Sequence, residues 1–127
     1  MSIERLGSGG RWEEEVGYSR AVRAGTFVFV AGCTGVTAGG DLVSGGPYEQ
    51  MAQACENVVA ALERAGATAA QVVQTRIYVT DIAQWPEVGR AHAEAFGAAP
   101  PAASMVQVTG LIDPRMVVEV EAVAFVG

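Results

Sequence analysis

The sequence predicts a single α/β (α+β) domain, residues 1–127, in which a sheet carries two helices on one face. Segments with strand periodicity alternate with helical ones in the order β-β-α-β-α-β-β, and no linker or repeat divides the chain. Strand–helix–strand units place their helices on one side of a sheet, so the other face has no cover from this chain. Half of the residues are apolar, and we therefore expect other subunits to cover that face.

Two strands and a loop begin the predicted sheet. The strands cover residues 18–24 and 26–32, around a tight turn at residues 23–25. The second strand is rich in β-branched and aromatic residues, which are typical of buried strands. Five glycines and a proline make residues 33–47 a loop, with a short hairpin around Gly39 and Gly40.

The clearest helix spans residues 48–65, where apolar residues recur every three or four positions and Gly66 follows. Residues 71–80 alternate as a strand, so their side chains divide between two faces. One face holds Val73, Thr75, Ile77 and Val79, and the other holds Gln74, Arg76 and Tyr78. The remaining elements are a helix at residues 84–96 and strands at residues 102–109 and 115–126.

The charged residues exclude several kinds of function. All eight cations are arginines, and the absence of lysine excludes Schiff-base catalysis and a lysine nucleophile. A net charge of −6 argues against a nucleic-acid partner, because phosphate-backbone binding depends on clustered cations. No apolar run is long enough to span a bilayer, and the amino terminus does not resemble a signal peptide. We therefore expect a cytoplasmic protein that binds neither membrane nor nucleic acid.

Motifs along the chain form a recognisable pattern. The first are residues 17–22 (GYSRAV) and 27–32 (FVFVAG), and a middle motif is residues 77–81 (IYVTD). The last are residues 101–106 (PAASMV) and 118–124 (VEVEAVA). Together they resemble the Rid (YjgF) family over nearly the whole chain and in the family's order.

The resemblance implies a chorismate-mutase-like fold that assembles as a homotrimer with small-molecule clefts between subunits. The best-known members hydrolyse reactive imines and enamines to a keto acid and ammonia. In those proteins an arginine of a Pro-Ala-Arg-Ser motif clamps the substrate carboxylate, and a glutamate of the last strand lies near the attacking water. Glu121 matches that glutamate, and Tyr18 matches a site tyrosine that either contacts a planar ligand or packs in the interface.

The sequence departs from the family at the clamping arginine, because Ala103 stands there. A guanidinium supplies two charge-assisted hydrogen bonds to a carboxylate, each worth about 1.5–3 kcal/mol, and alanine supplies none. The loss should lower activity on a 2-imino acid by orders of magnitude. Met105 also stands where many members have cysteine.

Three residues near the expected site, Glu119, Gly32 and Cys33, have both a functional and a structural interpretation. Glu119 shares a strand face with Glu121, and two carboxylates so placed repel each other unless water or a cation lies between them. The structural alternative is a half-exposed strand on which both carboxylates are solvated. Gly32 either admits a ligand to the backbone or simply ends a strand. Cys33 follows it in a loop near the site, whereas Cys55 falls on an apolar helix face and is expected in the core.

Two arginines and the single histidine are alternatives to the missing clamp. Arg76 lies on the uncovered face, where it either binds an anion or, as we favour, pairs with Glu119 or Glu121. Arg115 either reaches a cleft from a loop or, as we favour, lies at the surface. His92 is expected to be an exposed helix residue rather than a catalytic group. No metal-ligand spacing or phosphate-binding glycine loop is present, so we expect neither metal nor cofactor.

Two functions remain open. The favoured one is an enzyme that hydrolyses a small imine, enamine or related carbonyl compound at an intersubunit site, with Glu121 as the catalytic residue. Its substrate-binding residues would be Tyr18, Gly32, Cys33, Arg76, Ala103 and Met105. The alternative is a non-catalytic trimer that binds a metabolite or stabilises a partner enzyme. Acidity and the lack of lysine disfavour a third possibility, a ribonuclease.

Overall fold

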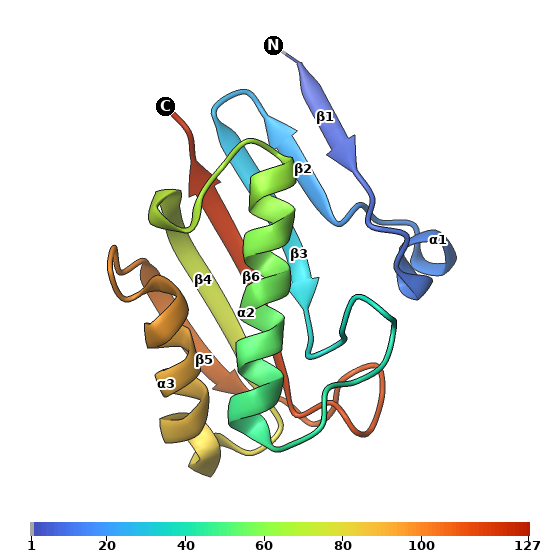
Figure 1. The fold of residues 1–127 in the computed structure, drawn as a ribbon, viewed down its shortest axis with the longest axis vertical. Helices are drawn as coiled ribbons and strands as arrows, with labels where there is room; N and C mark the ends of the chain where they lie inside the picture. Colours follow the sequence, from blue (N-terminus) through green and yellow to red (C-terminus); the bar gives the residue numbers. More distant parts are fainter. Residues whose placement is uncertain (1) are drawn as a thin grey trace.

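The computed structural model describes residues 2–127 as a six-stranded sheet with helices along it (Figure 1). The strands are β1 (Ile3–Leu6), β2 (Ala21–Ala24), β3 (Phe27–Cys33), β4 (Val72–Val79), β5 (Ala102–Gln107) and β6 (Val118–Phe125). The helices are α1 (Arg11–Val16), α2 (Pro47–Arg64) and α3 (Trp85–Phe96), with short 3-10 turns at Ala69–Gln71 and Ile82–Gln84. The strand order is β1-β2-β3-β6-β4-β5, and β4 and β5 are parallel whereas the other neighbours are antiparallel.

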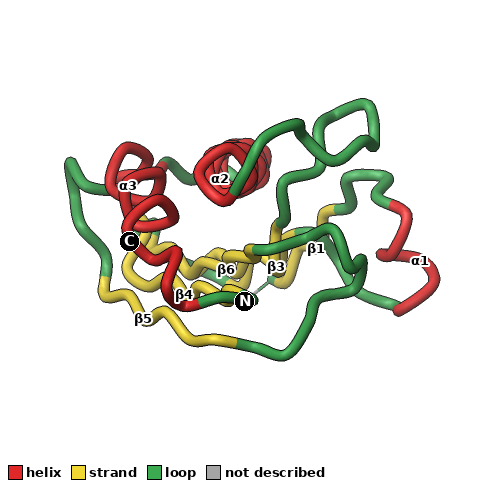
Figure 2. The backbone as a smooth tube through the Cα atoms, turned by 90° about the horizontal axis from the view of Figure 1, so that it is seen from below, coloured by secondary structure: helices red, strands yellow, loops and turns green. Residues whose placement is uncertain are grey.

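Two helices cover one face of the sheet and leave the other bare, as predicted. α2 and α3 lie side by side over the sheet, whereas α1 lies beyond its β1–β2 end (Figure 2). The core between these layers holds buried apolar side chains, among them Val28, Val58, Leu62, Phe96 and Val118. The opposite face carries Phe27, Phe29 and Phe125, which are 41, 46 and 43% exposed and lie next to one another. This apolar face has no cover within the described chain.

α2 lies within one residue of its predicted bounds because its signals agree at both ends. Pro47 occupies the first turn, where its missing N–H costs nothing, and the Glu49 carboxylate accepts a hydrogen bond from the backbone N–H of Gly46 at 2.8 Å. At the other end, the Arg23 guanidinium donates to the carbonyl oxygen of Ala65 at 2.9 Å. The loop before α2 also forms as predicted, with a β-bridge between Val36 and Leu42.

The amino-terminal segment adds β1 and α1, which the predicted order lacked. β1 pairs with β2 at the edge of the sheet, and α1 follows it. α1 has six residues and no apolar stripe, so its own sequence gives no periodic signal. Its position is fixed instead by Glu13, which accepts hydrogen bonds from Ser8 and lies 3.6 Å from Arg20.

Several strand bounds and one face assignment were wrong. β6 begins at Val118 rather than at residue 115, because Asp113 accepts a hydrogen bond from the backbone N–H of Arg115 at 2.9 Å and the chain turns there. β2 begins at Ala21 rather than at residue 18. In β4, Val73 is 47% exposed, although alternation placed it on the buried face with Thr75. The ladder with β6 shifts its register between residues 72 and 74, and such a bulge is invisible to simple alternation.

His92 is half-buried, which corrects the expectation of an exposed residue. Its Nε2 lies 2.8 Å from Oγ1 of Thr75, and its ring packs against Phe96 with centroids 5.2 Å apart. Burial lowers the pKa of His92 below its usual 6.5. The contacts give this histidine a structural role between α3 and the sheet.

We expect wild-type stability to fall more steeply than that of His92→Gln between about pH 8 and about pH 5.5. The pKa of His92 is lower in the folded chain than in the unfolded chain, so the unfolded chain binds the proton first. The stability present at higher pH is therefore lost as the pH falls through and below 6.5. Urea denaturation at the two pH values measures the loss, and equal losses in both proteins would contradict this account.

Candidate functional site

A groove of about 900 Å³ opens where β3 ends and β6 begins. Its walls come from α1, α2, the loop between β3 and α2, and the segment before β6. A groove of this size accommodates a small molecule. Of the residues singled out in the sequence, it is lined by Tyr18, Gly32, Cys33, Arg115 and Glu119.

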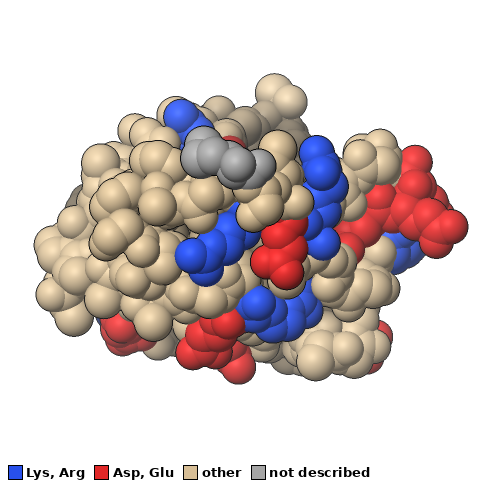
Figure 3. Space-filling view, turned by 90° about the horizontal axis from the view of Figure 1, so that it is seen from above, with Lys and Arg blue, Asp and Glu red and all other residues tan. Residues whose placement is uncertain are grey.

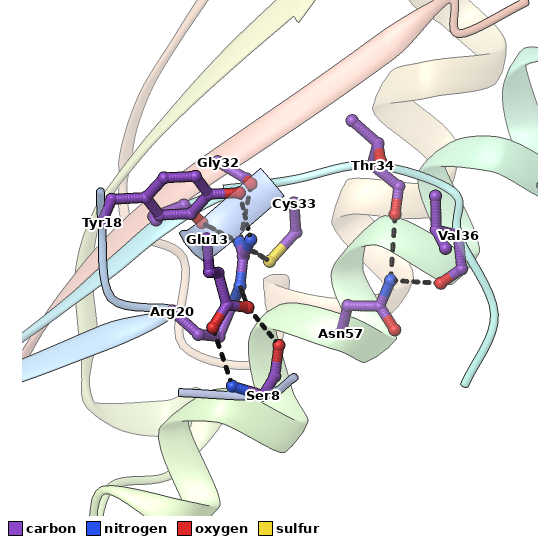
Figure 4. A network of polar contacts seen from close by, with 10 residues as sticks. Ser8, Glu13, Tyr18, Arg20, Gly32, Cys33, Thr34, Val36 and Asn57 are labelled. Carbon is purple, nitrogen blue, oxygen red and sulfur yellow. Dashed lines mark hydrogen bonds and ion pairs between the residues drawn. The ribbon is translucent and has the colours of Figure 1, made fainter. Parts of the chain in front are cut away.

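Arg20 lies at the centre of a polar network in this groove (Figure 4). Its guanidinium donates to four groups: the carbonyl oxygens of Ala31 (3.1 Å) and Gly32 (2.7 Å), the hydroxyl of Tyr18 (3.1 Å) and Sγ of Cys33 (3.3 Å). Only 14% of its side chain is exposed, and its Nε lies 3.6 Å from the Glu13 carboxylate. Most of its donors are therefore engaged within the protein, and Arg20 orders this end of the groove.

Sequence reasoning missed Arg20 and Glu13, although one signal was available. Arg20 lies two residues after Tyr18, so an extended chain places both side chains on one face. Burial raises the pKa of Glu13, but hydrogen bonds from Ser8 and the charge of Arg20 outweigh it, and the net pKa is lowered. Glu13 is thus a carboxylate at neutral pH and holds the guanidinium in place.

Cys33 is a protonated thiol rather than an activated nucleophile. Burial raises its pKa, and the nearby Arg20 charge opposes this only in part. Cys55 lies in the core, where burial raises its pKa to about 12. Its packing role follows the prediction, and Cys33 contributes polarity and volume to the groove rather than a thiolate.

Glu119 extends from β6 to Gly32 on the neighbouring strand. A Cβ atom on residue 32 would meet the Glu119 carboxylate, so glycine lets that side chain lie against the β3 backbone. Burial raises the pKa of Glu119, Arg20 lowers it in part, and the charge of Glu121 raises it further. None of the hydrogen bonds or ion pairs found among residues 2–127 holds this carboxylate. It is therefore available to a ligand and is easier to protonate than an ordinary glutamate.

Glu121 lies two residues further along β6, on the bare face, beside Arg76 and Tyr78 of β4. The Tyr78 hydroxyl donates a hydrogen bond to one carboxylate oxygen, and Nη1 of Arg76 lies 3.7 Å from the other. The hydrogen bond to Glu121 and burial raise the pKa of Tyr78, so the phenol remains a donor. The structure thus shows the pairing of Arg76 with Glu121 that we favoured over a free anion-binding arginine.

Ala103 and Met105 lie apart from this groove, on the edge strand β5. Met105 pairs with Ile77 of β4 and packs against the core, so alternation places Ala103 on the same, helix-covered side. Glu119 and Glu121 alternate with the buried residues of β6 and face the other way. One chain therefore brings Tyr18, Gly32 and Cys33 together with Glu119 but does not bring Ala103 or Met105 to them.

Arg115 stands at the rim of the groove as an exposed residue. Its guanidinium forms two hydrogen bonds to Asp113, at 2.9 and 3.1 Å, and its side chain is 71% exposed. These bonds lower the pKa of Asp113 to about 2. The surface role that we favoured from the sequence fits these contacts.

The remaining surface offers no extended cationic patch on the face that Figure 3 shows. Arginine and acidic atoms lie there in small groups, several of them directly beside one another, and acidic atoms gather at the end where α1 lies (Figure 3). Among residues 2–127, no group of three or more histidine, cysteine, aspartate or glutamate side chains is placed to hold a metal. In the same part of the chain, no helix is long and apolar enough to cross a membrane.

Comparisons with known proteins agree on one family. A family model described as endoribonuclease L-PSP matches residues 10–126. The crystal structure of a Mycobacterium tuberculosis protein of the YjgF/YER057c/UK114 family is 50% identical, with a TM-score of 0.90 over 98% of this chain and 100% of that one. An uncharacterized protein of Streptomyces coelicolor is 38% identical over 99% of this chain and 94% of its own. The human 2-iminobutanoate/2-iminopropanoate deaminase is 33% identical over 87% of this chain and 80% of its own. These likenesses confirm the predicted fold class and the resemblance seen in the motifs.

Proposed function

The chain belongs to the endoribonuclease L-PSP family, which includes the YjgF-type (Rid) proteins, and on this premise we propose that it hydrolyses a small imine, enamine or related carbonyl compound. Relatives named as a 2-iminobutanoate/2-iminopropanoate deaminase and a reactive intermediate deaminase support this chemistry. The observation that carries the proposal is the pair of carboxylates on β6. Glu121 is oriented by two neighbours, whereas Glu119 is free and faces Gly32.

The proposed site lies where copies of the chain meet in a homotrimer. The exposed phenylalanines of the bare face support assembly, since a contiguous apolar surface is normally covered. Tyr18, Gly32, Cys33 and Arg76 would form one wall of the site around Glu121. The opposite wall would come from β5 of a neighbouring copy, with Ala103 and Met105, because neither residue lines the groove within one chain.

The two carboxylates have different roles in the proposed reaction. Glu121 orients a water molecule and accepts one of its protons as the water oxygen bonds to the imine carbon, while the nitrogen gains a proton from Glu119. The carbinolamine nitrogen then takes the proton held by Glu121, and the C–N bond breaks as the hydroxyl proton passes to Glu119 and the carbonyl forms. Imine and water thus give a carbonyl compound and ammonia, and each glutamate ends in its starting state. The raised pKa of Glu119 suits a proton donor.

An assay with imines generated in place by an amino-acid oxidase tests the proposal. Purified protein should remove the imines and release ammonia faster than buffer alone. Because Ala103 supplies no carboxylate clamp, neutral imines should be turned over at least as well as 2-imino acids. The hydrolase proposal fails if neither kind of imine disappears faster than in buffer.

Ala103 also favours a second candidate, a trimer that binds a metabolite or stabilises a partner enzyme without catalysis. Without the clamping arginine, the protein binds the carboxylate of a substrate less tightly, but the groove of about 900 Å³ remains. Thermal-shift screening against keto acids, aromatic acids and neutral carbonyl compounds separates the two. A stabilising ligand without any turnover would favour the binding protein. We do not propose ribonuclease activity, because the net charge of −6 and the absence of lysine oppose RNA binding.

A further inference from the structure

The groove that Glu119 lines also runs along α2. Asn57, Ala60, Ala61 and Arg64 line it at three- and four-residue spacing, so they form one stripe of the helix. The Asn57 amide donates to the carbonyl oxygens of Thr34 (2.9 Å) and Val36 (2.8 Å). Thr34 directly follows Cys33 in the chain. Arg64 lies two helical turns beyond Asn57, which is about 10 Å along the axis. Ala60 and Ala61 lie between them, and their small side chains leave space in the groove.

The groove is richer in positive charge than the rest of this acidic chain. Four of its eight arginines line it, Arg11, Arg20, Arg64 and Arg115, together with two acids, Asp113 and Glu119. Arg20 and Arg115 are paired with Glu13 and Asp113. Among residues 2–127, Arg11 and Arg64 have no ion-pair partner. Unpaired arginines in a concave site concentrate anions there.

Arg11 and Arg64 differ in how they are held. The Arg11 guanidinium rests over the Trp12 ring, 4.1 Å from its centroid, and lowers the pKa of Asp113 from a distance. The positive charge of Arg11 therefore also acts on Asp113, at the rim of the groove. Arg64 is exposed in the last turn of α2 and has no such neighbour. Its fork of donors is free to bind a carboxylate.

We propose that the groove binds an elongated anion about 10 Å long, whose carbonyl or imine end lies beside Asn57, in the groove that Glu119 also lines, and whose terminal carboxylate binds Arg64. The inference rests on the proposed function and assigns its substrate class. An imino acid of three or four carbons spans about half that distance and cannot join the two ends. Arg64 thus supplies, at the far end of a longer ligand, the charge that position 103 lacks.

Calorimetric titration with 7-oxooctanoate, its methyl ester and 2-oxobutanoate tests this assignment. In the wild-type protein, 7-oxooctanoate should bind at least about 10-fold more tightly than its ester, as expected for charge-assisted hydrogen bonds. It should also bind more tightly than 2-oxobutanoate, which is too short. Arg64→Gln should remove the preference for the acid. Arg5→Gln removes the same charge from an exposed position on β1 and should leave the preference unchanged.

Three results would overturn the assignment: equal affinity for acid and ester, no binding of either, or unchanged acid affinity in Arg64→Gln. The comparison of acid with ester needs no variant, so it decides the matter even if Arg64→Gln folds poorly. Turnover of short imines is measured separately. Hydrolysis without binding of the long acid would overturn only this inference, whereas binding without hydrolysis of any imine would overturn only the proposed enzyme.

Discussion

Glu121→Gln is expected to lower the rate of imine hydrolysis by about 100- to 1,000-fold. Glutamine has nearly the same shape and still accepts the hydrogen bond from Tyr78, but it carries no charge to orient the attacking water or to pair with Arg76. The loss should therefore appear in kcat more than in KM.

Initial rates of ammonia release, measured for the variant and the wild type, check this expectation. Glu4→Gln is the matched control, because Glu4 is exposed on β1, far along the sheet from β6. Glu119→Gln should mainly change the alkaline side of the pH–rate profile, which reports the proton donor. Wild-type rates in Glu121→Gln would remove this residue from the mechanism and leave Glu119 as the carboxylate to examine.

Arg20→Gln is expected to lower the free energy of unfolding by about 2–4 kcal/mol. The change leaves the buried Glu13 carboxylate without its cation and removes donors from the carbonyl oxygen of Gly32 and the hydroxyl of Tyr18. A partner left unpaired in a buried site costs more than the net worth of the contact itself.

Urea denaturation with a matched variant measures this loss. Arg5→Gln removes an exposed arginine with no role in the network and should change stability by less than about 0.5 kcal/mol. Arg20→Lys keeps the charge but not the fork of donors and should fall between the two. An Arg20→Gln loss no larger than that of Arg5→Gln would show that the network does not stabilise the fold.

The long elements of the fold were predictable because each carries its own periodic pattern. α2 repeats its apolar residues every three or four positions between a proline and a glycine, and β3 is apolar and β-branched. α1 has no such pattern, since three consecutive glutamates make up half of its six residues. Its place depends on Glu13 meeting Arg20, a contact that forms only in the folded chain. The exposure of Val73 likewise depends on a register shift that local sequence does not specify.

The site was predictable to the extent that the motifs fixed residue types. Tyr18, Gly32 and Cys33 do lie in one groove, and Arg76 does pair with Glu121. The sequence did not show that Ala103 and Met105 lie apart from these residues within one chain. The reason is that the face on which an edge-strand residue lies is set by the register of β5 with β4. Glu119 was undervalued for a related reason. Its burial against Gly32 arises from pairing between β3 and β6, which are far apart in sequence.

The aromatic face formed by Phe27, Phe29 and Phe125 has a thermodynamic consequence. If copies of the chain cover it, dissociation returns three large rings to water, and folding and association become linked equilibria. The denaturation midpoint would then rise with protein concentration, and dilution alone would loosen the structure. How much of the protein a cell makes would accordingly set the fraction of intact sites, independently of any change in its sequence.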